Sequence, residues 1–337
     1  MSTAQPRTRP SSDLRPADGE RSSASEPASK SATGAGAPTL DAGAGWSAPV
    51  RGAAEDDAGD DGSIDDLAPL DVRLRGVRVT YFDAGPRDAP AVVMLHALGA
   101  DRRRWHGLAR ALLDRHRVIA LDFPGFGASE RADHRRPPPT YESLAETVLD
   151  LVAALDLGRV TLIGHSMGAG AALVAAADRP EFVERLVLVA APLHRGAIGL
   201  VDRLATAPVV GGAMFRHLVG GAAMRRRGVA AVDWADAADA TWSMLRRSIE
   251  SSVLEARLSR VRAPTLLVWG RDDRVAPSAI GARLAREIRG ARLEILECGH
   301  APEVERPAAF IALIEGFLAA TVRTTPTPAP TRLRGRR

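Results

Sequence analysis

Residues 160–178 read VTLIGHSMGAGAALVAAAD, a short apolar run, a turn with glycine and serine, and an alanine-rich run. The first run has the composition of a buried strand, and the last has that of a helix. Between them lies Gly164-His165-Ser166-Met167-Gly168, a GxSxG pattern. A tight turn of this kind raises its serine above the edge of a sheet, and small flanking residues let the backbone pass closely. The stretch therefore predicts Ser166 as a reactive hydroxyl.

Two other structures produce a glycine-rich turn between a strand and a helix. An ordinary connecting turn is an alternative, although the strand before and the helix after favour the reactive serine. A phosphate-binding loop is disfavoured, because neither the GxxxxGK[ST] spacing nor the GxGxxG spacing is present.

A serine hydroxyl is a weak nucleophile until a base removes its proton, and the base must itself be oriented by an acid. Candidates for both follow later apolar runs: WGRDD comes after TLLV, and CGH comes after LEILE. His300 is the candidate base, and Asp272 and Asp273 are both candidate acids. Parallel strands end at one edge of their sheet, so we expect these side chains near the serine. The chain order is serine, acid, histidine.

Apolar runs alternate with helical segments through the body of the chain. The predicted strands are Val77–Phe82, Ala91–His96, Arg117–Asp122, Val160–Ile163, Leu186–Val189, Thr265–Trp269 and Leu293–Leu296. The predicted helices are Arg102–Leu113, Tyr141–Leu155, Met167–Asp178, Ser278–Ile288 and Ala308–Leu318. Most strands are apolar throughout, as in strands buried on both faces. The alternation predicts an α/β fold with a mostly parallel, doubly covered sheet.

Several motifs together resemble the α/β-hydrolase family over about residues 70–320. They are His96-Ala97-Leu98-Gly99, the run DFPGFGAS at 122–129, the turn GHSMG, WGRDD with Pro277 beyond it, and Gly299-His300 followed by Pro302, Glu305 and Pro307. The resemblance implies Ser166 as nucleophile, His300 as general base and Asp273 as the orienting acid, because the family spaces it WGxxD. Asp272 is the nearest rival. The family's other position for this acid follows LVLVA, where this chain has alanine and proline.

The resemblance also implies two backbone N–H donors, those of Leu98 and Met167, for the oxyanion that forms in acyl transfer. The family usually has His-Gly where this chain has His96-Ala97, and that glycine is expected to let the loop bend. The chain lacks the glycine run of lipase-like esterases and the GGGPG-like run of carbon–carbon bond hydrolases, which disfavours both subfamilies. A serine at the turn disfavours the haloalkane dehalogenase and epoxide hydrolase branches, which place aspartate there.

Other residues that could carry chemistry are interpreted as structural or inert. His96 and His165 flank the candidate site, and histidines at such positions in this family are mostly structural. Cys298 is a lone thiol without its own partner base. His194 and His217 have no carboxylate or cysteine at metal spacing, so we expect no metal and no cofactor.

The chain changes character at both ends and once in its body. Residues 1–69 hold twelve acidic and six basic residues among Ser, Ala, Gly and Pro, which predicts a disordered acidic segment. Residues 322–337 are predicted to be a disordered basic tail. The α/β-hydrolase domain is expected at 70–321. Within it, residues from about 194 to 260 lack a convincing strand and are predicted to form a helical cap over the strand ends.

Composition excludes several classes of protein. The 337 residues are 45% hydrophobic, enough for a sizeable core, and a single cysteine excludes a disulfide scaffold. No apolar run is long enough to span a membrane, and the amino terminus lacks the apolar stretch of a secretory signal. A cytoplasmic location is therefore expected. The body has no dense basic run interleaved with aromatics, so no nucleic-acid partner is expected despite a net charge of +4.

Together these features predict a cofactor-free serine hydrolase that acts through an acyl-enzyme. Its substrate would be a carboxylic ester or related acyl compound, small to medium in size and partly apolar. Alternatives with the same triad are an acyltransferase, a carbon–carbon bond hydrolase and a perhydrolase. A further alternative is a non-catalytic binding protein that has kept the fold. The oligomeric state does not follow from the sequence.

Overall fold

A computed structural model of the chain describes residues 67–130, 139–191 and 252–320, and they form one eight-stranded sheet with helices. The strands are β1 (Leu70–Leu74), β2 (Val77–Ala84), β3 (Ala91–Leu95), β4 (Arg117–Leu121), β5 (Val160–His165), β6 (Val183–Val189), β7 (Thr265–Gly270) and β8 (Arg292–Leu296). The helices are η2 (Arg102–Trp105), α1 (His106–Leu112), α2 (Tyr141–Ala154), α3 (Met167–Asp178), η3 (Pro180–Phe182), α8 (Ser252–Glu255), η5 (Leu258–Arg260), α9 (Ser278–Glu287), α10 (Pro302–Glu305) and α11 (Pro307–Ala319).

The sheet is mostly parallel, in the order β1-β2-β4-β3-β5-β6-β7-β8. The pairs β1–β2 and β2–β4 are antiparallel, and every other pair is parallel. The expected α/β architecture is therefore confirmed, with an added strand, β1, that the sequence did not predict. Because β3, β5, β6 and β7 are neighbours and parallel, the loops after them meet at one edge of the sheet.

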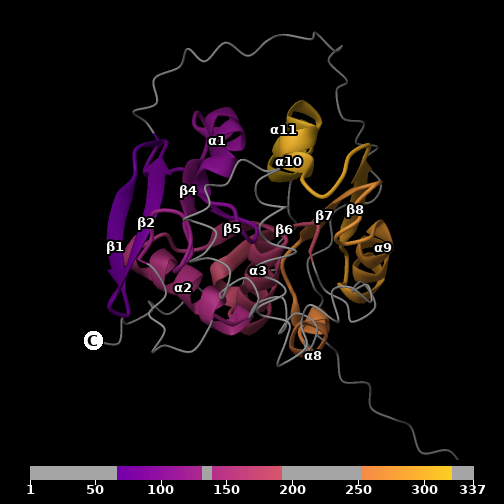
Figure 1. Cartoon of the computed structure of the whole chain (residues 1–337), viewed down its shortest axis with the longest axis horizontal. Helices are drawn as coiled ribbons and strands as arrows, with labels where there is room; N and C mark the ends of the chain where they lie inside the picture. The colour runs from indigo at the N-terminus through magenta and orange to yellow at the C-terminus, as the bar shows by residue number, and fades with distance from the viewer. Residues whose placement is uncertain (1–66, 131–138, 192–251, 321–337) are drawn as a thin grey trace, which may run out of the picture. The chain divides into compact units, whose positions relative to one another are not determined.

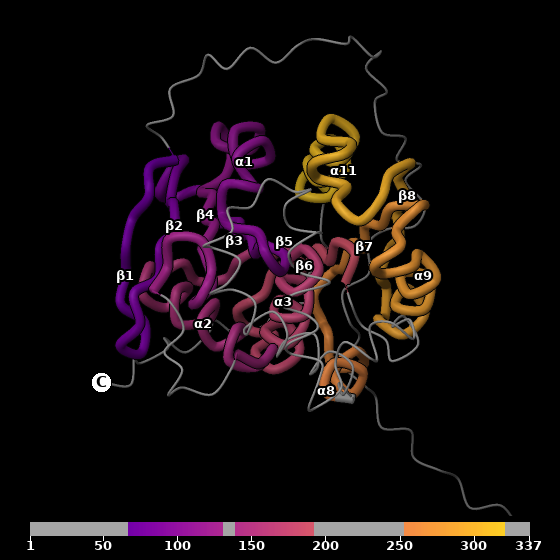
Figure 2. Tube along the Cα trace, viewed as in Figure 1, coloured from indigo at the N-terminus to yellow at the C-terminus, as the bar shows by residue number. Residues whose placement is uncertain are grey.

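Helices cover both faces of the sheet (Figure 1). Helices α1 and α11 pack against each other on one face, whereas α2 and α3 pack against each other on the other. Helix α9 covers β7 and β8 at the far end of the sheet, as the tube in Figure 2 shows. The prediction of a doubly covered sheet is thus confirmed.

The most deeply buried strands are those with helices on both faces of the sheet. Every residue of β3, β5 and β7 is buried, whereas the edge strand β8 is only half-buried. Trp105 and Phe310 pack together from η2 and α11, with ring centroids 6.5 Å apart, and both are fully buried. Trp105 is thus a core residue. The central strands fix the backbone from which the candidate site residues project.

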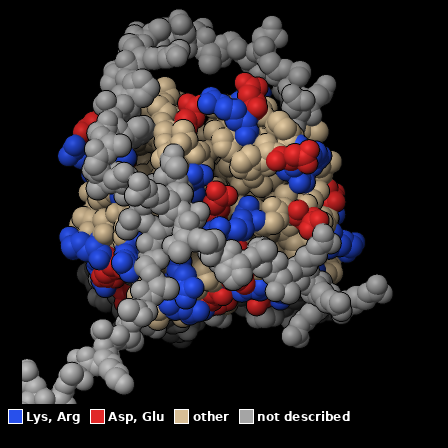
Figure 3. Space-filling model, turned by 180° about the vertical axis from the view of Figure 1, so that it is seen from behind, with Lys and Arg blue, Asp and Glu red and all other residues tan. Residues whose placement is uncertain are grey.

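Charged side chains of both signs lie next to one another on the surface (Figure 3). Arg75, for example, forms ion pairs with Glu146 and Asp150, and all three side chains are substantially exposed. Exposed pairs of this kind contribute only about 0–1 kcal/mol each. The stability of the fold therefore comes chiefly from its apolar core.

Three predicted segments fall largely or wholly outside the described residues. They are the acidic amino-terminal segment at 1–69, most of the cap at 194–260 and the basic tail at 322–337. Within the described part of the chain, no helix combines the length and apolar character needed to cross a membrane.

Candidate active site

Ser166 lies at the sharp turn between β5 and α3, with φ of 50° and ψ of −111°. Its backbone N–H donates to the carbonyl of Val189 at 2.8 Å, and its own carbonyl accepts from the N–H of Ala169 at 2.9 Å. A positive φ is strained for a residue with a side chain, and such strain persists only where the surroundings impose it. The turn thus fixes Ser166 at the start of α3, at the edge of the sheet where β5 ends.

Glycines on either side of Ser166 let three pieces of backbone approach closely. A Cβ on Gly164 would lie 2.4 Å from the carbonyl oxygen of Gly168, and a Cβ on Gly168 would lie 2.3 Å from the carbonyl oxygen of Leu95. Real Cβ atoms do not come so close to backbone oxygen. The sequence argument for small residues at these two positions is therefore confirmed in detail.

Asp273 and His300 are in direct contact although 27 residues separate them in the chain. Nδ1 of His300 lies 2.8 Å from Oδ2 of Asp273. The other oxygen, Oδ1, accepts from the N–H groups of Val275 and Ala276 at 2.8 Å each. The Asp273 side chain is completely buried, whereas 16% of the His300 side chain is exposed. The carboxylate is thus anchored by its own loop and orients the imidazole.

The rival acid, Asp272, is exposed, and its backbone N–H donates to the carbonyl of Cys298 at 3.0 Å. Of the two candidate aspartates, only Asp273 pairs with His300.

The structure links Ser166 to His300 through the neighbouring residue, His165. Nε2 of His165 lies 2.8 Å from the carbonyl oxygen of His300, and the two imidazole rings have centroids 5.0 Å apart. The hydroxyl of Ser166 forms no hydrogen bond with any residue in the described ranges. Catalytic hydrogen bonds are often long in unliganded enzymes and shorten when substrate binds.

The environment of His300 favours its neutral form. Burial lowers the pKa of His300 below its usual value, although the hydrogen bond to Asp273 acts in the opposite direction. With the Nδ1 proton directed at Asp273, Nε2 is the nitrogen left to accept a proton. A neutral imidazole in this tautomer has the form that a general base requires.

The loop after β3 carries the candidate donor Leu98. Nε2 of His96 accepts the N–H of Phe123 at 3.0 Å, so the ring proton is on Nδ1, 2.8 Å from the carbonyl oxygen of Ala97. His96 is fully buried, and this burial lowers its pKa. Its ring therefore fastens the peptide between Ala97 and Leu98 to the loop after β4, which fits the structural role expected for it.

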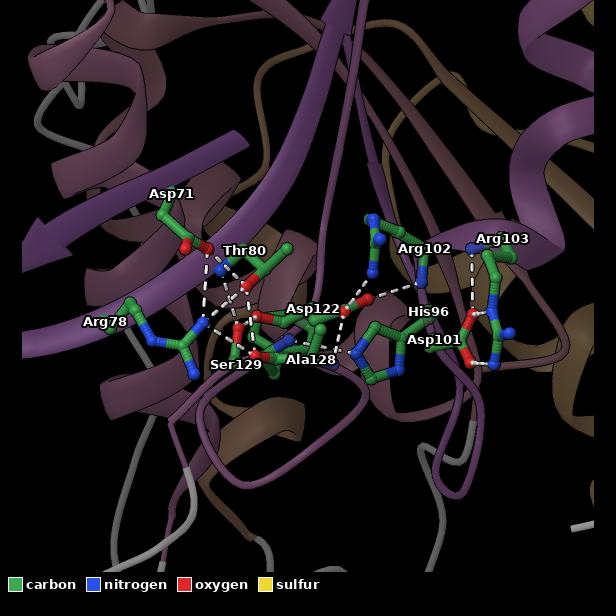
Figure 4. A network of polar contacts seen from close by, with 11 residues as sticks. Asp71, Arg78, Thr80, His96, Asp101, Arg102, Arg103, Asp122, Ala128 and Ser129 are labelled. Atoms are coloured by element: carbon green, nitrogen blue, oxygen red, sulfur yellow. Dashed lines mark hydrogen bonds and ion pairs between the residues drawn. The ribbon is translucent and has the colours of Figure 1, made fainter. Parts of the chain in front are cut away.

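Asp122 ties that loop to η2 from a completely buried position (Figure 4). Its carboxylate accepts from the backbone N–H of Arg102 at 2.7 Å, from Nη1 of Arg102 at 2.6 Å and from the N–H of Ala128 at 2.8 Å. The hydroxyl of Ser129 donates to the Asp122 carbonyl at 2.6 Å. Asp122 was noted only as part of a motif, and the structure shows it as the anchor of the loop beside His96.

Of two further residues near His300, the sequence analysis considered Cys298 but not Glu303. Cys298 is buried, and burial raises the pKa of its thiol to about 11, which agrees with the expectation of an inert thiol. Glu303 was not singled out, yet it lies in α10 with 2% of its side chain exposed, against His165. A buried glutamate is unusual unless paired, but no sequence pattern reports such burial in advance.

Comparison with known proteins identifies the family of the chain. Residues 92–313 match the alpha/beta hydrolase family. The chain belongs to this family. An uncharacterized protein of Mycobacterium tuberculosis is 28% identical over 305 residues, covering 77% of this chain and 84% of that protein. The 2-hydroxy-6-oxononadienedioate/2-hydroxy-6-oxononatrienedioate hydrolase of Escherichia coli is 30% identical over 271 residues, covering 72% of this chain and 91% of that protein.

Among solved structures, the enol-lactonase of Burkholderia xenovorans resembles this hydrolase with a TM-score of 0.60 and 27% identity. The match covers 74% of this chain and 99% of that protein. The chain is therefore similar both to a protein named as a hydrolase of 2-hydroxy-6-oxononadienedioate and to one named as an enol-lactonase. Membership of the hydrolase family is shown, and the bond that is cleaved is a separate question.

The departure from the family at Ala97 leaves the loop undistorted. Ala97 is buried and does not have a φ in the left-handed region, so an alanine fits there without backbone strain. The left-handed residue of this loop is Gly99, with φ of 69°. The bend that was assigned to a glycine after His96 is made two residues later.

Proposed function

We propose that the protein is a serine hydrolase that cleaves a carboxylic ester or related acyl bond through an acyl-enzyme. Its substrate is small to medium in size and partly apolar. The observation that carries the proposal is the buried Asp273–His300 pair beside the strained turn that presents Ser166. A base oriented by a buried acid has its use where a weak nucleophile must be activated.

The reaction proceeds in two halves. Oγ of Ser166 attacks the carbonyl carbon while its proton passes to Nε2 of His300, and that proton then moves to the departing alcohol as the ester bond breaks. Water next attacks the acyl-enzyme, gives a proton to His300, and releases the carboxylic acid as Ser166 recovers its proton. Asp273 keeps the imidazole in the required tautomer and stabilises its charged form.

Leu98 and Met167 supply the backbone donors for the oxyanion. Within the described ranges neither N–H donates to an acceptor, so both are available to a ligand. His96 donates to the carbonyl of the peptide whose N–H belongs to Leu98. Because the two groups of a trans peptide point in opposite directions, fastening the carbonyl also aims the N–H. One such donor is worth about 3–4 kcal/mol in the transition state.

The pairing of two arginines in η2, which follows the loop of Leu98, supports ester cleavage over carbon–carbon bond cleavage as far as the described residues go. The substrate in the name of the E. coli relative is a dicarboxylate, and binding a dicarboxylate calls for cationic side chains. Arg102 is committed to Asp122, and Arg104 is committed to Glu303. The similarity to an enol-lactonase also supports an ester-like bond. Carbon–carbon bond hydrolysis is the second candidate, on the strength of the 30% identity.

Substrate assays with a matched variant test the proposal. The protein and its Ser166→Ala variant are given chromogenic esters of increasing acyl length and, separately, a 2-hydroxy-6-oxo-dienoate. We expect ester turnover by the wild-type protein and none above background by the variant. Equal rates for the two proteins would reject a serine hydrolase, and turnover of the dienoate alone would establish the second candidate.

Two further measurements separate the remaining alternatives. Added alcohol or hydrogen peroxide gives an ester or peracid product if the acyl group is transferred, and the yield of that product measures acyltransferase or perhydrolase activity. An active-site phosphonate is expected to label the peptide that contains Ser166. A protein that turns over neither the esters nor the dienoate and does not take the label is a binding protein of the same fold.

A further inference from the structure

His165, the residue before the proposed nucleophile, joins two parts of the chain that are far apart in sequence. It ends β5, and only 2% of its side chain is exposed. Its Nε2 lies 2.8 Å from the carbonyl oxygen of His300. Its Nδ1 lies 2.8 Å from Oε1 of Glu303, whose side chain is equally buried. His165 therefore connects the turn that carries Ser166 to the loop that carries the proposed base.

Both ring nitrogens of His165 face oxygen atoms, and this determines where its protons are. A carbonyl oxygen only accepts hydrogen bonds, so Nε2 carries a proton. An unprotonated Nδ1 would then place its lone pair against a carboxylate oxygen in the interior, which is repulsive. A proton on Nδ1 makes the contact an attraction between opposite charges. Such an attraction tolerates the poor hydrogen-bond alignment that this close contact has.

Glu303 is kept ionised by a second cation. Nη1 of Arg104, in η2, donates to the same Oε1 of Glu303 at 3.1 Å. The guanidinium donates to Oε1, the same oxygen that faces Nδ1 of His165, so this oxygen acts as an acceptor and a proton placed on it would oppose the contact with Arg104.

We propose that His165 is a doubly protonated positioning residue: paired with Glu303, it anchors the His300 backbone, and its positive charge favours the neutral, basic form of the His300 ring. This inference rests on the proposed role of His300. The contacts of His165 are with the His300 carbonyl, the His300 ring and Glu303, so its proposed action is through His300.

The charges around His300 set the direction of the effect. A positive charge with its ring centroid 5.0 Å away disfavours a second proton on His300. The pKa of His300 is lowered by burial, raised by the hydrogen bond to Asp273, and lowered again by the charge on His165. Among the described residues, the ionisable groups near this loop include Asp273, Glu303 and Glu305, which favour protonation, and His165, Arg104 and Arg306, which oppose it.

A spectroscopic measurement tests the protonation without a change in this region. Selective 15N labelling of histidine in the wild-type protein reports whether each ring nitrogen bears a proton, and the His165 signals are assigned by their loss in His165→Gln. At pH 7 we expect protons on both nitrogens of His165 and on one nitrogen of His300. One bare nitrogen on His165 would overturn the inference. The result does not depend on turnover, so it is independent of the Ser166→Ala assay.

A variant tests the effect on the base. Gln at position 165 can still donate to the His300 carbonyl but carries no charge. In His165→Gln we expect the acid limb of the pH profile of kcat/KM to move to higher pH, so that kcat/KM on that limb falls about threefold or more relative to wild type. His116→Gln, before β4 and so at the opposite edge of the sheet, is the control and keeps the wild-type profile. A folded His165→Gln with an unshifted acid limb would contradict the proposal.

Discussion

His300 contacts Asp273 through Nδ1 and Oδ2 at 2.8 Å, and that carboxylate is completely buried while the adjacent Asp272 is exposed. The sequence alone leaves these two neighbouring aspartates nearly equivalent as candidate acids, but the fold of the loop buries one and exposes the other. Substituting each in turn therefore tests which of them orients His300.

Asp273→Asn is expected to lower kcat by roughly three to four orders of magnitude. The amide would present a donor where Oδ2 accepts, and His300 would be held in the wrong tautomer. Asp272→Asn makes the same chemical change on the surface and should alter kcat by less than about twofold. Steady-state kinetics on a chromogenic ester measures both. Similar losses in the two variants would refute the assignment of the acid.

The activity of the protein should persist at mildly acidic pH. Only neutral His300 can accept the proton of Ser166, so kcat/KM falls as pH drops through the pKa of His300. Burial lowers that pKa. The acid limb should therefore lie below about pH 6.5, the pKa of an ordinary histidine. A pH profile of kcat/KM in constant ionic strength checks this, and a midpoint above pH 6.5 would count against the stated environment.

The Leu98 donor can be removed without changing any catalytic side chain. Leu98→Pro eliminates one N–H and should lower kcat by about 10²–10³-fold. Leu98→Ala keeps the N–H and loses only part of a half-buried side chain, so its kcat should stay within about an order of magnitude of wild type. Circular dichroism establishes that both variants fold. A folded proline variant as active as the alanine variant would remove Leu98 from the proposed oxyanion site.

The close approach of the Gly168 carbonyl to Gly164 predicts that a methyl group added at position 164 destabilises the protein. Gly164→Ala places a Cβ 2.4 Å from backbone oxygen, so the turn or α3 must move, at a cost of about 1–3 kcal/mol or more. Gly107→Ala, in α1, meets no atom within 4 Å and should stabilise the helix by about 0.5–1 kcal/mol. Urea unfolding of the two variants compares them directly. Equal unfolding free energies would show that the turn relaxes freely.

Removing the buried anchor should destabilise the fold far more than removing a surface charge. Asp122→Ala leaves Arg102 and two backbone N–H groups without their acceptor. We expect a loss of about 3–5 kcal/mol. Glu297→Ala breaks the pair with Arg271, which is exposed on both sides, and should cost less than about 1 kcal/mol. Thermal unfolding measures both, and comparable losses would contradict the anchoring role.

Much of the sheet was predictable because its central strands are buried on both faces. The predicted strand Thr265–Trp269 differs from β7 by one residue, and the predicted helix Met167–Asp178 coincides with α3. Strand β1 was not predicted, because LDVRL is an edge strand with only one fully buried residue. Its apolar pattern is too weak to stand out. The predicted helix Arg102–Leu113 divides into η2 and α1, since Asp101 caps a short first turn.

The positions of the three candidate catalytic residues were predictable because parallel strands end at the same edge of the sheet. Ser166, Asp273 and His300 each follow a recognisable strand, so their common edge could be inferred from the chain order alone. The contacts of Glu303 could not be inferred, because its meeting with His165 depends on how the loop after β8 folds back. The loop at Ala97 illustrates the same limit, since its bend is set by the backbone angle of Gly99.

The single thiol of the chain has a practical consequence. Cys298 is enclosed and holds its proton up to about pH 11, so maleimides and iodoacetamide should leave the native protein untouched at neutral pH. Any covalent adduct that an electrophilic library forms under those conditions then originates elsewhere in the molecule. A mass shift of the intact chain under these conditions therefore reports modification of a residue other than the cysteine, which makes this hydrolase a convenient subject for activity-based profiling.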